Sequence, residues 1–205
     1  MKPSKLNLLI DLDNTLIEAI DDSISEITYR EDIFWLSEHQ KFVKIRPYTR
    51  EFLESVSTHY KTTVVTLGER DFAEAVVEIL DPEQKFFGGR IASLNEFDRP
   101  ANVMLKIRCP DKLRRTAILI DRANVWECRE NVLRVQPYQY FKTLDDNDDQ
   151  LKHLEKVLID SEKQFHERNE KDQMLPDIRE FLKKHKKMSA DSWLNWCLSV
   201  FSGAF

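Results

Sequence analysis

Two carboxylic acids near the start of the chain, Asp11 and Asp13, lie two residues apart at the end of an apolar run. They belong to the segment Asp11–Leu16, with the sequence DLDNTL, which directly follows the apolar segment Leu6–Ile10. On extended backbone two such residues point to the same side, and two close carboxylates repel unless a cation lies between them or one keeps its proton. The pattern suits a Mg²⁺ site that carries an aspartyl nucleophile. The alternative interpretation is a strand that ends in an Asx turn and a helix cap.

Polar residues able to do chemistry also end two later apolar runs. The runs are Thr62–Thr66 and Thr116–Ile120, and Asp121 follows the second directly. Short apolar runs of this kind predict buried parallel strands. In the segments that connect the strands, apolar residues recur at helical spacing within Pro47–His59 and Arg70–Leu80. Strands that alternate with helices favour an α/β fold with a doubly wound parallel sheet and an active site at the carboxyl ends of its strands.

Two segments break this alternation. Ser23–Arg46 is rich in charged and aromatic residues and is interpreted as a small hairpin or lid, while Thr143–Gln150 is acidic and typical of a boundary. Beyond it, apolar residues recur at helical spacing from Leu151, and a second helix is expected over about Pro176–Lys187. We therefore expect a catalytic domain over residues 1–145 and a helical C-terminal extension over residues 146–205.

The composition limits the classes of protein that the chain can belong to. Its formal charge of −5 argues against a general nucleic-acid binder. Three cysteines without CxxC spacing indicate neither a disulfide framework nor a zinc site, and they suit a reducing, intracellular compartment. No apolar stretch is long enough for a signal peptide or a transmembrane segment, so we expect a soluble protein. The four glycines form no phosphate-binding loop, so a metal, a hydroxyl group and a lysine would have to hold any phosphate.

The order of the candidate catalytic residues along the chain resembles the signature of the haloacid dehalogenase superfamily of phosphotransferases. That order is DLDNT after the first strand, Thr66 after the second, a lysine before the third and Asp121 after it. Further segments are similar to one branch, the phosphatases that act on the C-terminal repeat domain of RNA polymerase II: Ile45–Leu53, Asp81–Ile91, Ile120–Trp126 and Val135–Phe141. The similarity covers residues 6–141 and continues weakly to about residue 184. It implies a haloacid dehalogenase-like, Rossmannoid sheet with a small insertion near the active site and a helical C-terminal segment.

The resemblance also implies roles for the acids. Asp11 would be the nucleophile that forms an aspartyl phosphate, and Asp13 would be the general acid and then the general base. Mg²⁺ would be bound by the Asp11 carboxylate, the backbone carbonyl of Asp13 and the Asp121 carboxylate. Such a cation, with fixed donors, can supply most of the catalysis in phosphoryl transfer.

Four other residues are expected to hold the phosphate or the substrate. Thr66 would donate its hydroxyl to a phosphoryl oxygen, and Lys106 would neutralise the phosphate, although Lys112 on the same stretch is a second candidate for that lysine. Arg46 is assigned to substrate binding, with a structural ion pair as the alternative. Thr15 is placed in the same group and is expected to fix the loop after the nucleophile.

One position departs from the family pattern. The family has two adjacent acid or amide residues after the third strand, whereas this chain has Ile120 followed by Asp121. Asp121 aligns with the residue that reaches the metal, and Ile120 replaces the acid that orients the lysine. We therefore expect the absence of this supporting carboxylate to lower metal affinity or activity by roughly 10- to 100-fold, with the mechanism retained.

The expected function is that of a Mg²⁺-dependent phosphoprotein phosphatase that favours phosphoserine or phosphothreonine. The short insertion leaves an open site, which suits an extended peptide, and the aromatic segment Ile33–Val43 is expected to select the leaving group. The alternatives are a phosphotyrosine-specific phosphatase of this fold, a weakly active or inactive binding module, and a small-molecule phosphatase. Phosphatase activity with Mg²⁺ that is lost in Asp11→Asn would separate the enzymes from the binding module.

The end of the chain combines a basic cluster, Lys183–Lys187, with the apolar and aromatic segment Trp193–Phe201. Packing on the same chain is the simpler interpretation of this segment, and contact with a partner or with anionic lipid is the other. The expected substrate is a phosphoprotein or phosphopeptide, with no direct binding of nucleic acid. The resemblance is compatible with a nuclear or cytoplasmic protein, or with a microbial phosphatase that works inside a host cell.

Overall fold

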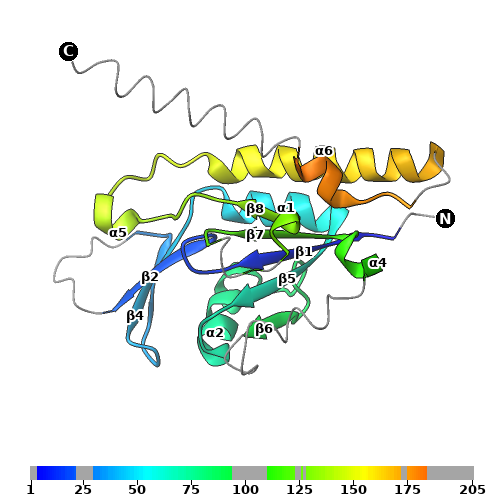
Figure 1. The fold of residues 1–205 in the computed structure, drawn as a ribbon. Helices are drawn as coiled ribbons and strands as arrows, with labels where there is room; N and C mark the ends of the chain where they lie inside the picture. The colour runs from blue at the N-terminus through cyan, green and yellow to red at the C-terminus, as the bar shows by residue number, and fades with distance from the viewer. Residues whose placement is uncertain are drawn as a thin grey trace, which may run out of the picture.

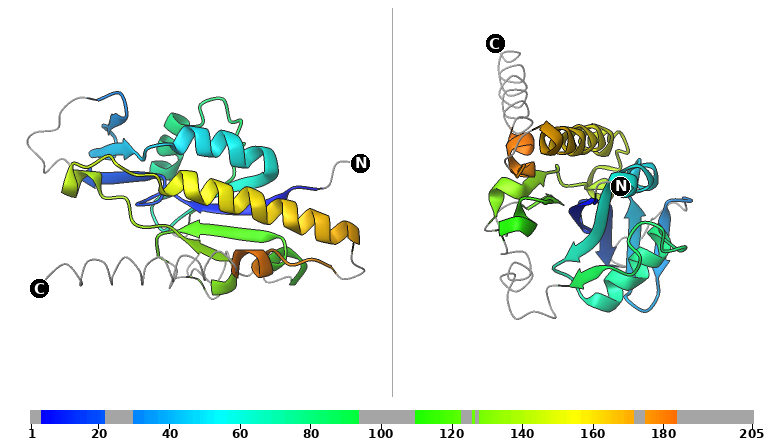
Figure 2. Two further views of the ribbon diagram at one scale, coloured as in Figure 1. Left: turned by 90° about the horizontal axis from the view of Figure 1, so that it is seen from above. Right: turned by 90° about the vertical axis from the view of Figure 1, so that its right-hand side faces the viewer.

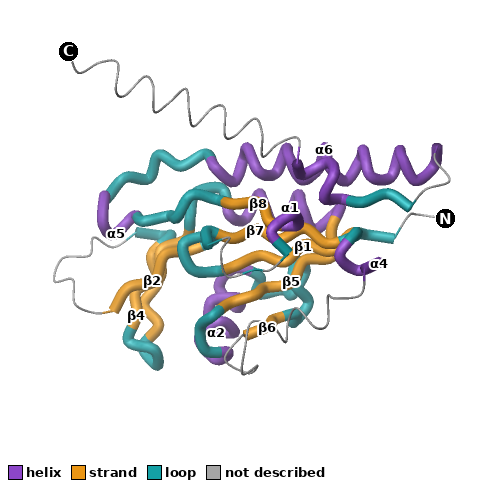
Figure 3. Tube along the Cα trace, in the orientation of Figure 1, coloured by secondary structure: helices purple, strands orange, loops and turns teal. Residues whose placement is uncertain are grey.

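A five-stranded parallel sheet forms the centre of the protein. The computed structural model describes residues 4–21, 30–93, 110–122, 126, 128–171 and 175–183. The order of the strands across the sheet is β6-β5-β1-β7-β8, and every neighbouring pair is parallel (Figures 1 and 3). In chain order the strands are β1 (Leu6–Asp11), β5 (Tyr60–Thr66), β6 (Ile91–Ser93), β7 (Thr116–Ile120) and β8 (Val132–Arg134). The three strands predicted from the apolar runs are therefore neighbours at the centre of the sheet, and the predicted α/β fold is confirmed.

Helices pack on one face of this sheet. Side chains alternate along β1, so that Leu8 and Ile10 belong to a large apolar core, whereas Leu9 belongs to a smaller cluster on the other face. The large core also contains apolar residues of the three long helices, and α6 lies alongside α1 (Figure 2). The helices are α1 (Thr49–His59), α2 (Arg70–Leu80), α4 (Pro110–Leu113), η3 (Arg129–Asn131), α5 (Tyr140–Thr143) and α6 (Gln150–Lys171).

The predicted insertion is a second, three-stranded antiparallel sheet. It consists of β2 (Ile17–Asp21), β3 (Ile33–Leu36) and β4 (Lys41–Ile45), in the order β2-β4-β3. The sequence analysis predicted the hairpin of β3 and β4 but not the third strand, β2. This small sheet lies beyond the carboxyl end of β1 (Figure 1), so it stands next to the expected active site.

The C-terminal segment packs on the same core as the sheet. Leu151, Leu158 and Phe165 of α6 are buried in the large core, together with Phe181 and Leu182 of a further helical turn. The helical C-terminal segment is thus present in the described residues. The division of the chain after residue 145 stays a prediction, and the described residues on its two sides share one hydrophobic core.

Candidate active site

Three of the predicted site residues stand at the carboxyl ends of neighbouring strands. Asp11 ends β1, Thr66 ends β5 and Asp121 directly follows β7. In the parallel register Asp11 pairs with Val65, the residue before Thr66, and Ile10 pairs with Leu119, two residues before Asp121. The sheet therefore brings Asp11, Thr66 and Asp121 to one edge, which is where α/β sheets bind their ligands.

The carboxyl groups at this edge are crowded. Burial, the nearby charges of Asp121 and Asp13 and a hydrogen bond with Asp121 together raise the pKa of Asp11 to about 8. Burial also raises the pKa of Asp13, against the charge of Lys41, which lowers it. Burial and the neighbouring carboxylates thus disfavour the ionised forms of these acids, which a bound cation would stabilise.

Two of these carboxylates are suited to hold a divalent cation. Asp11 and Asp121 contact each other through their carboxyl groups, and oxygen atoms are the ligands that Mg²⁺ prefers. Within the described part of the chain, no group of three or more His, Cys, Asp or Glu side chains could hold a metal ion. The expected ligand set has only two side chains, with the backbone carbonyl of Asp13 as its third member. The donor chemistry of these residues fits a hard cation.

A glycine lies between Thr66 and Asp13. The backbone amide of Gly68 donates a hydrogen bond to the Thr66 hydroxyl oxygen at 3.0 Å. A Cβ atom added at Gly68 would lie 3.3 Å from that oxygen and 3.8 Å from Oδ2 of Asp13. Ser93, at the end of β6, donates a hydrogen bond of 2.6 Å to the Gly68 carbonyl. The sequence analysis missed Gly68 and Ser93, and a glycine two residues after the predicted phosphate-binding threonine was the available signal.

Thr15 and Arg46, which are predicted to bind substrate, are both buried. The Thr15 side chain is fully buried and the Arg46 guanidinium has no exposed surface. Arg46 instead pairs with Asp148 through two hydrogen bonds, of 3.0 and 2.7 Å, and donates a third, of 3.1 Å, to the backbone carbonyl of Thr15. Arg46 therefore holds the loop that follows Asp11. This arrangement agrees with the alternative interpretation of Arg46 as part of a structural ion pair.

The residue that departs from the family pattern faces an apolar cluster. Ile120 is 5% exposed and packs in the cluster on the second face of the sheet, with Leu9, Val65 and Trp126 among its members. In the parallel register Ile10 pairs with Leu119, so Ile120 lies beside Asp11. An apolar side chain thus lies next to the candidate nucleophile, where the family pattern has an acid.

The two candidate lysines differ in their positions. Lys112 lies in α4, just before β7 begins, whereas Asp121 follows the end of β7. Five strand residues span roughly 16 Å, so Lys112 is at the opposite edge of the sheet from the carboxyl groups. Lys106 lies outside the described residues and its role stays a prediction.

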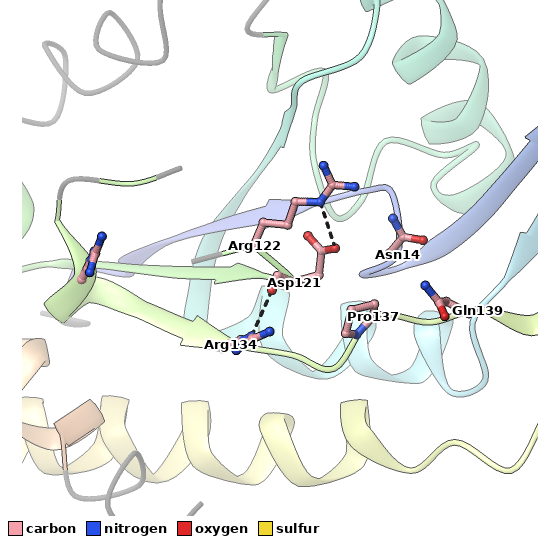
Figure 4. A pocket seen from close by; sticks show the side chains of 7 residues that line it. Asn14, Asp121, Arg122, Arg134, Pro137 and Gln139 are labelled. Atoms are coloured by element: carbon pink, nitrogen blue, oxygen red, sulfur yellow. Dashed lines mark hydrogen bonds and ion pairs between the residues drawn. The ribbon is translucent and has the colours of Figure 1, made fainter. Parts of the chain in front are cut away.

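Among the described residues, two pockets adjoin the carboxyl groups, on opposite sides of β1. One, of about 590 Å³, lies toward β7 and β8 and includes Asn14, Asp121 and Arg134 in its lining (Figure 4). The other, of about 550 Å³, lies toward α2 and the insertion and includes Asp13 and Gly68. A bound substrate can therefore extend from the carboxyl groups in either direction.

The C-terminal basic and aromatic segments fall almost entirely outside the described residues. Lys183 is described, and its ammonium group lies 2.8 Å from a carboxylate oxygen of Glu130. Among the described residues, no helix is long and apolar enough to cross a membrane.

The parallel sheet has an aspartate at the end of its central strand, a threonine beside that aspartate and a second acid across from it. This arrangement is that of a haloacid dehalogenase-like protein. The chain belongs to the family of NLI interacting factor-like phosphatases, whose family model matches residues 6–169. Within the superfamily, the predicted resemblance to the phosphatase branch is confirmed.

Curated relatives and solved structures support the same membership. The chain is 30% identical over 229 residues to an RNA polymerase II C-terminal domain phosphatase of Caenorhabditis elegans, with 97% of the chain and 34% of the relative covered. The phosphatase of the same name from Encephalitozoon cuniculi is 35% identical over 145 residues, which cover 70% of the chain and 34% of the relative. The chain spans about a third of the length of these two relatives.

The structure of the fission yeast RNA polymerase II CTD phosphatase Fcp1-R271A bound to beryllium fluoride has the same fold. It superimposes with a TM-score of 0.70 at 20% sequence identity, and the match covers 88% of this chain and 70% of that one.

Proposed function

We propose that the protein is a Mg²⁺-dependent phosphoprotein phosphatase that works through an aspartyl-phosphate intermediate on Asp11. The observation that carries this proposal is the cluster of Asp11, Asp13 and Asp121 at the carboxyl edge of the sheet, where mutual repulsion and burial raise the pKa of Asp11 to about 8. Membership of a phosphatase family supports it.

The two acids of the DLDNT motif have separate tasks in this mechanism. Asp11 attacks the phosphorus atom, so it has to be ionised, and a cation at its carboxylate would favour that form. Asp13 protonates the leaving alcohol and later accepts a proton from the attacking water. The raised pKa of Asp13 favours the protonated form that the first of these tasks needs.

The remaining residues hold the phosphoryl group and the cation. Mg²⁺, held by the carboxylates of Asp11 and Asp121 and the backbone carbonyl of Asp13, would neutralise charge on the phosphoryl oxygens. Thr66 accepts a hydrogen bond from Gly68 and can donate its own hydroxyl proton to a phosphoryl oxygen. Lys106 is proposed as the cationic partner of the phosphate.

We further propose phosphoserine or phosphothreonine in an extended peptide as the substrate. Two pockets adjoin the carboxyl groups, which gives room for chain on both sides of a phosphorylated residue. The relatives from Caenorhabditis elegans and Encephalitozoon cuniculi are named for the C-terminal domain of RNA polymerase II, and this supports the same substrate and a nuclear location for this protein.

The first experiment measures hydrolysis of an aryl phosphate with and without Mg²⁺. We expect Asp11→Asn to lower kcat by at least about 1,000-fold, because the nucleophile is lost. Asp111→Asn makes the same chemical change on the exposed first turn of α4, at the opposite edge of the sheet, and should keep the wild-type rate. Equal rates in wild type and Asp11→Asn would reject the mechanism.

A binding measurement supports the assay. Beryllium fluoride mimics a phosphoryl group bound to a carboxylate, so with Mg²⁺ it should raise the melting temperature of the wild type and of Asp111→Asn but not that of Asp11→Asn. Competition among phosphoserine, phosphothreonine and phosphotyrosine peptides then tests the leaving group. A phosphotyrosine peptide that outcompetes the other two would overturn the stated preference.

A further inference from the structure

The pocket on the β8 side of the candidate active site is strongly basic. Among the described residues, its lining includes three arginines, Arg122, Arg129 and Arg134, and one carboxylate, Asp121 (Figure 4). We call it the arginine pocket. All three arginines are exposed, whereas Asp121 is 4% exposed. The accessible charge in the arginine pocket is therefore positive.

The arginines are carried by elements that are fixed to the sheet. Arg134 ends β8, and its Nε donates a hydrogen bond of 3.2 Å to the backbone carbonyl of Asp121. Arg129 lies in the short helix η3, directly before β8. Nε of Arg122 lies 3.6 Å from the Asp121 carboxylate (Figure 4). A basic site on such elements is partly organised before a ligand arrives, which lowers the entropic cost of binding.

The arginine pocket is continuous with the candidate active site. Asp121 belongs to both, and Asn14, which follows Asp13 directly, lines the pocket wall. Arg134 pairs with Ile120 of β7, and β7 is the neighbour of β1, so two strand spacings separate Arg134 from the strand of Asp11. Two spacings are roughly 10 Å, which is also the span of about three residues of extended peptide.

We propose that the arginine pocket binds a second anionic group of the substrate, a phosphate or a carboxylate, two to four residues from the phosphorylated residue that reacts. Arginine guanidinium groups suit both anions because they can donate two parallel hydrogen bonds. The inference rests on the proposed phosphatase function and specifies its substrate as a peptide that carries at least two anionic groups.

The test compares peptides of one sequence with Mg²⁺ present. One has a single phosphoserine, and the others add a second phosphoserine or a glutamate at spacings of one to six residues on either side. We expect kcat/KM for the first phosphate to rise about 3- to 10-fold for an added anion two to four residues away on one side only. The gain should shrink as the salt concentration rises, because exposed charges are screened.

Two variants connect the effect to the arginine pocket. Arg129→Gln should lower the ratio of kcat/KM between doubly and singly anionic peptides by about 3- to 10-fold. Arg50→Gln is the matched control, because Arg50 is an exposed arginine at the start of α1, away from both pockets beside the carboxyl groups, and it should keep the wild-type ratio. Circular dichroism and melting temperatures should show both variants folded.

The outcomes separate this inference from the function on which it rests. If the wild type leaves the singly phosphorylated peptide intact while the protein is folded, the phosphatase proposal fails. If the wild type hydrolyses that peptide but gains nothing from a second anion at any spacing, or if Arg129→Gln keeps the gain, the arginine pocket does not bind the substrate and only this inference is overturned. A gain from phosphate but not from glutamate would identify the second group as a phosphate.

Discussion

Two groups of acidic residues in this protein are placed in opposite electrostatic surroundings. The buried ammonium group of Lys44 lies 2.5 Å from a carboxylate oxygen of Asp32 and 3.0 Å from one of Asp146. The buried guanidinium group of Arg46 lies 2.7 Å from a carboxylate oxygen of Asp148. We call these five residues the ion-pair network. Asp11, Asp13 and Asp121 lie close together, with the exposed Arg122 3.6 Å from Asp121, and we call the three acids the carboxyl cluster.

The pKa shifts of Asp32 and Asp11 have opposite directions. Hydrogen bonds from Lys44 and Arg30 lower the pKa of Asp32 in spite of its partial burial, whereas burial and the neighbouring acids raise the pKa of Asp11 to about 8. The acids of the ion-pair network are neutralised by cations of the chain, whereas the proposed function requires a bound cation to stabilise the charge of the carboxyl cluster. Changes in the ion-pair network should therefore alter the stability of the fold, and changes in the carboxyl cluster should alter catalysis and metal dependence.

The largest expected effect on stability comes from breaking the pair of Arg46 and Asp148. Asp148→Asn leaves the guanidinium buried without its counter-charge, which should lower the free energy of unfolding by about 3–5 kcal/mol. Asparagine keeps an oxygen that can accept the hydrogen bond from the Gln150 amide at the start of α6. The loss of stability therefore measures the contribution of the ion pair. Urea denaturation of the metal-free protein measures it.

The comparison is the exposed pair of Arg30 and Asp32, at the solvent side of the same network. The two side chains are 41% and 37% exposed, so Arg30→Gln should cost no more than about 1 kcal/mol. If Asp148→Asn costs no more than Arg30→Gln, the ion-pair network does not stabilise the fold in the way that its burial implies.

A somewhat smaller loss of stability is expected when a carboxylate is added beside the carboxyl cluster. Ile120→Asp restores the acid that the family pattern has, but it places a charge in an apolar cluster beside the carboxylate of Asp11. We expect the free energy of unfolding to fall by about 2–4 kcal/mol. The loss should be smaller with Mg²⁺ present, because a cation nearby would stabilise the new charge.

Ile120→Val is the control for packing alone, and it should cost about 1 kcal/mol. An Ile120→Asp protein as stable as the wild type without metal would mean that this end of the site tolerates a further carboxylate. The neighbouring apolar packing would then not explain why isoleucine occupies the position.

The comparison also shows which parts of the molecule can be predicted from the sequence. The carboxyl cluster was predictable because Asp11 and Asp121 stand at the ends of short apolar strands, Asp13 follows Asp11 two residues later, and parallel strands bring their carboxyl ends together. The partner of Arg46 was not predictable, because Asp148 lies 102 residues away in a segment that resembles a linker. Thr15 was assigned to the substrate for a related reason, since residues in a motif do not reveal which of them point into the core.

The fold shows the same division between local and distant information. The sequence predicted the central strands, α1 and α2, because their apolar periodicity is local. It did not predict β2, which is short and whose apolar pattern begins directly after the DLDNTL motif. Nor did it predict that α6 shares the core of the sheet, because a buried helical face does not identify its partner.

A gain in stability is expected when the carboxyl cluster loses a charge. The pKa of Asp11 is raised from 3.8 to about 8, so between these values the folded protein holds a proton that the unfolded chain has lost. Such a group lowers stability progressively as the pH rises through this window. Asn cannot ionise, so Asp11→Asn should be more stable than the wild type without metal, with the advantage growing as the pH rises from 4 to 8.

Urea denaturation at several pH values, with EDTA, measures that advantage. Mg²⁺ should then reduce it, because the cation stabilises the ionised wild type and not the variant. A variant whose stability matches the wild type at every pH would contradict the view that the carboxyl cluster is electrostatically strained.

The smallest expected effect on stability, with a clear effect on activity, comes from Gly68→Ala. The backbone of Gly68 is not in the left-handed region, so alanine fits the local conformation and should change the free energy of unfolding by less than about 0.5 kcal/mol. Its Cβ would lie 3.3 Å from the Thr66 hydroxyl oxygen, which would have to move by a few tenths of an ångström. Because phosphoryl transfer depends on fixed donors, kcat/KM with an aryl phosphate should fall about 3- to 10-fold. A rate equal to that of the wild type would show that the Thr66 hydroxyl does not need the position that Gly68 gives it, and a large loss of stability would place Gly68 with the residues that serve the fold.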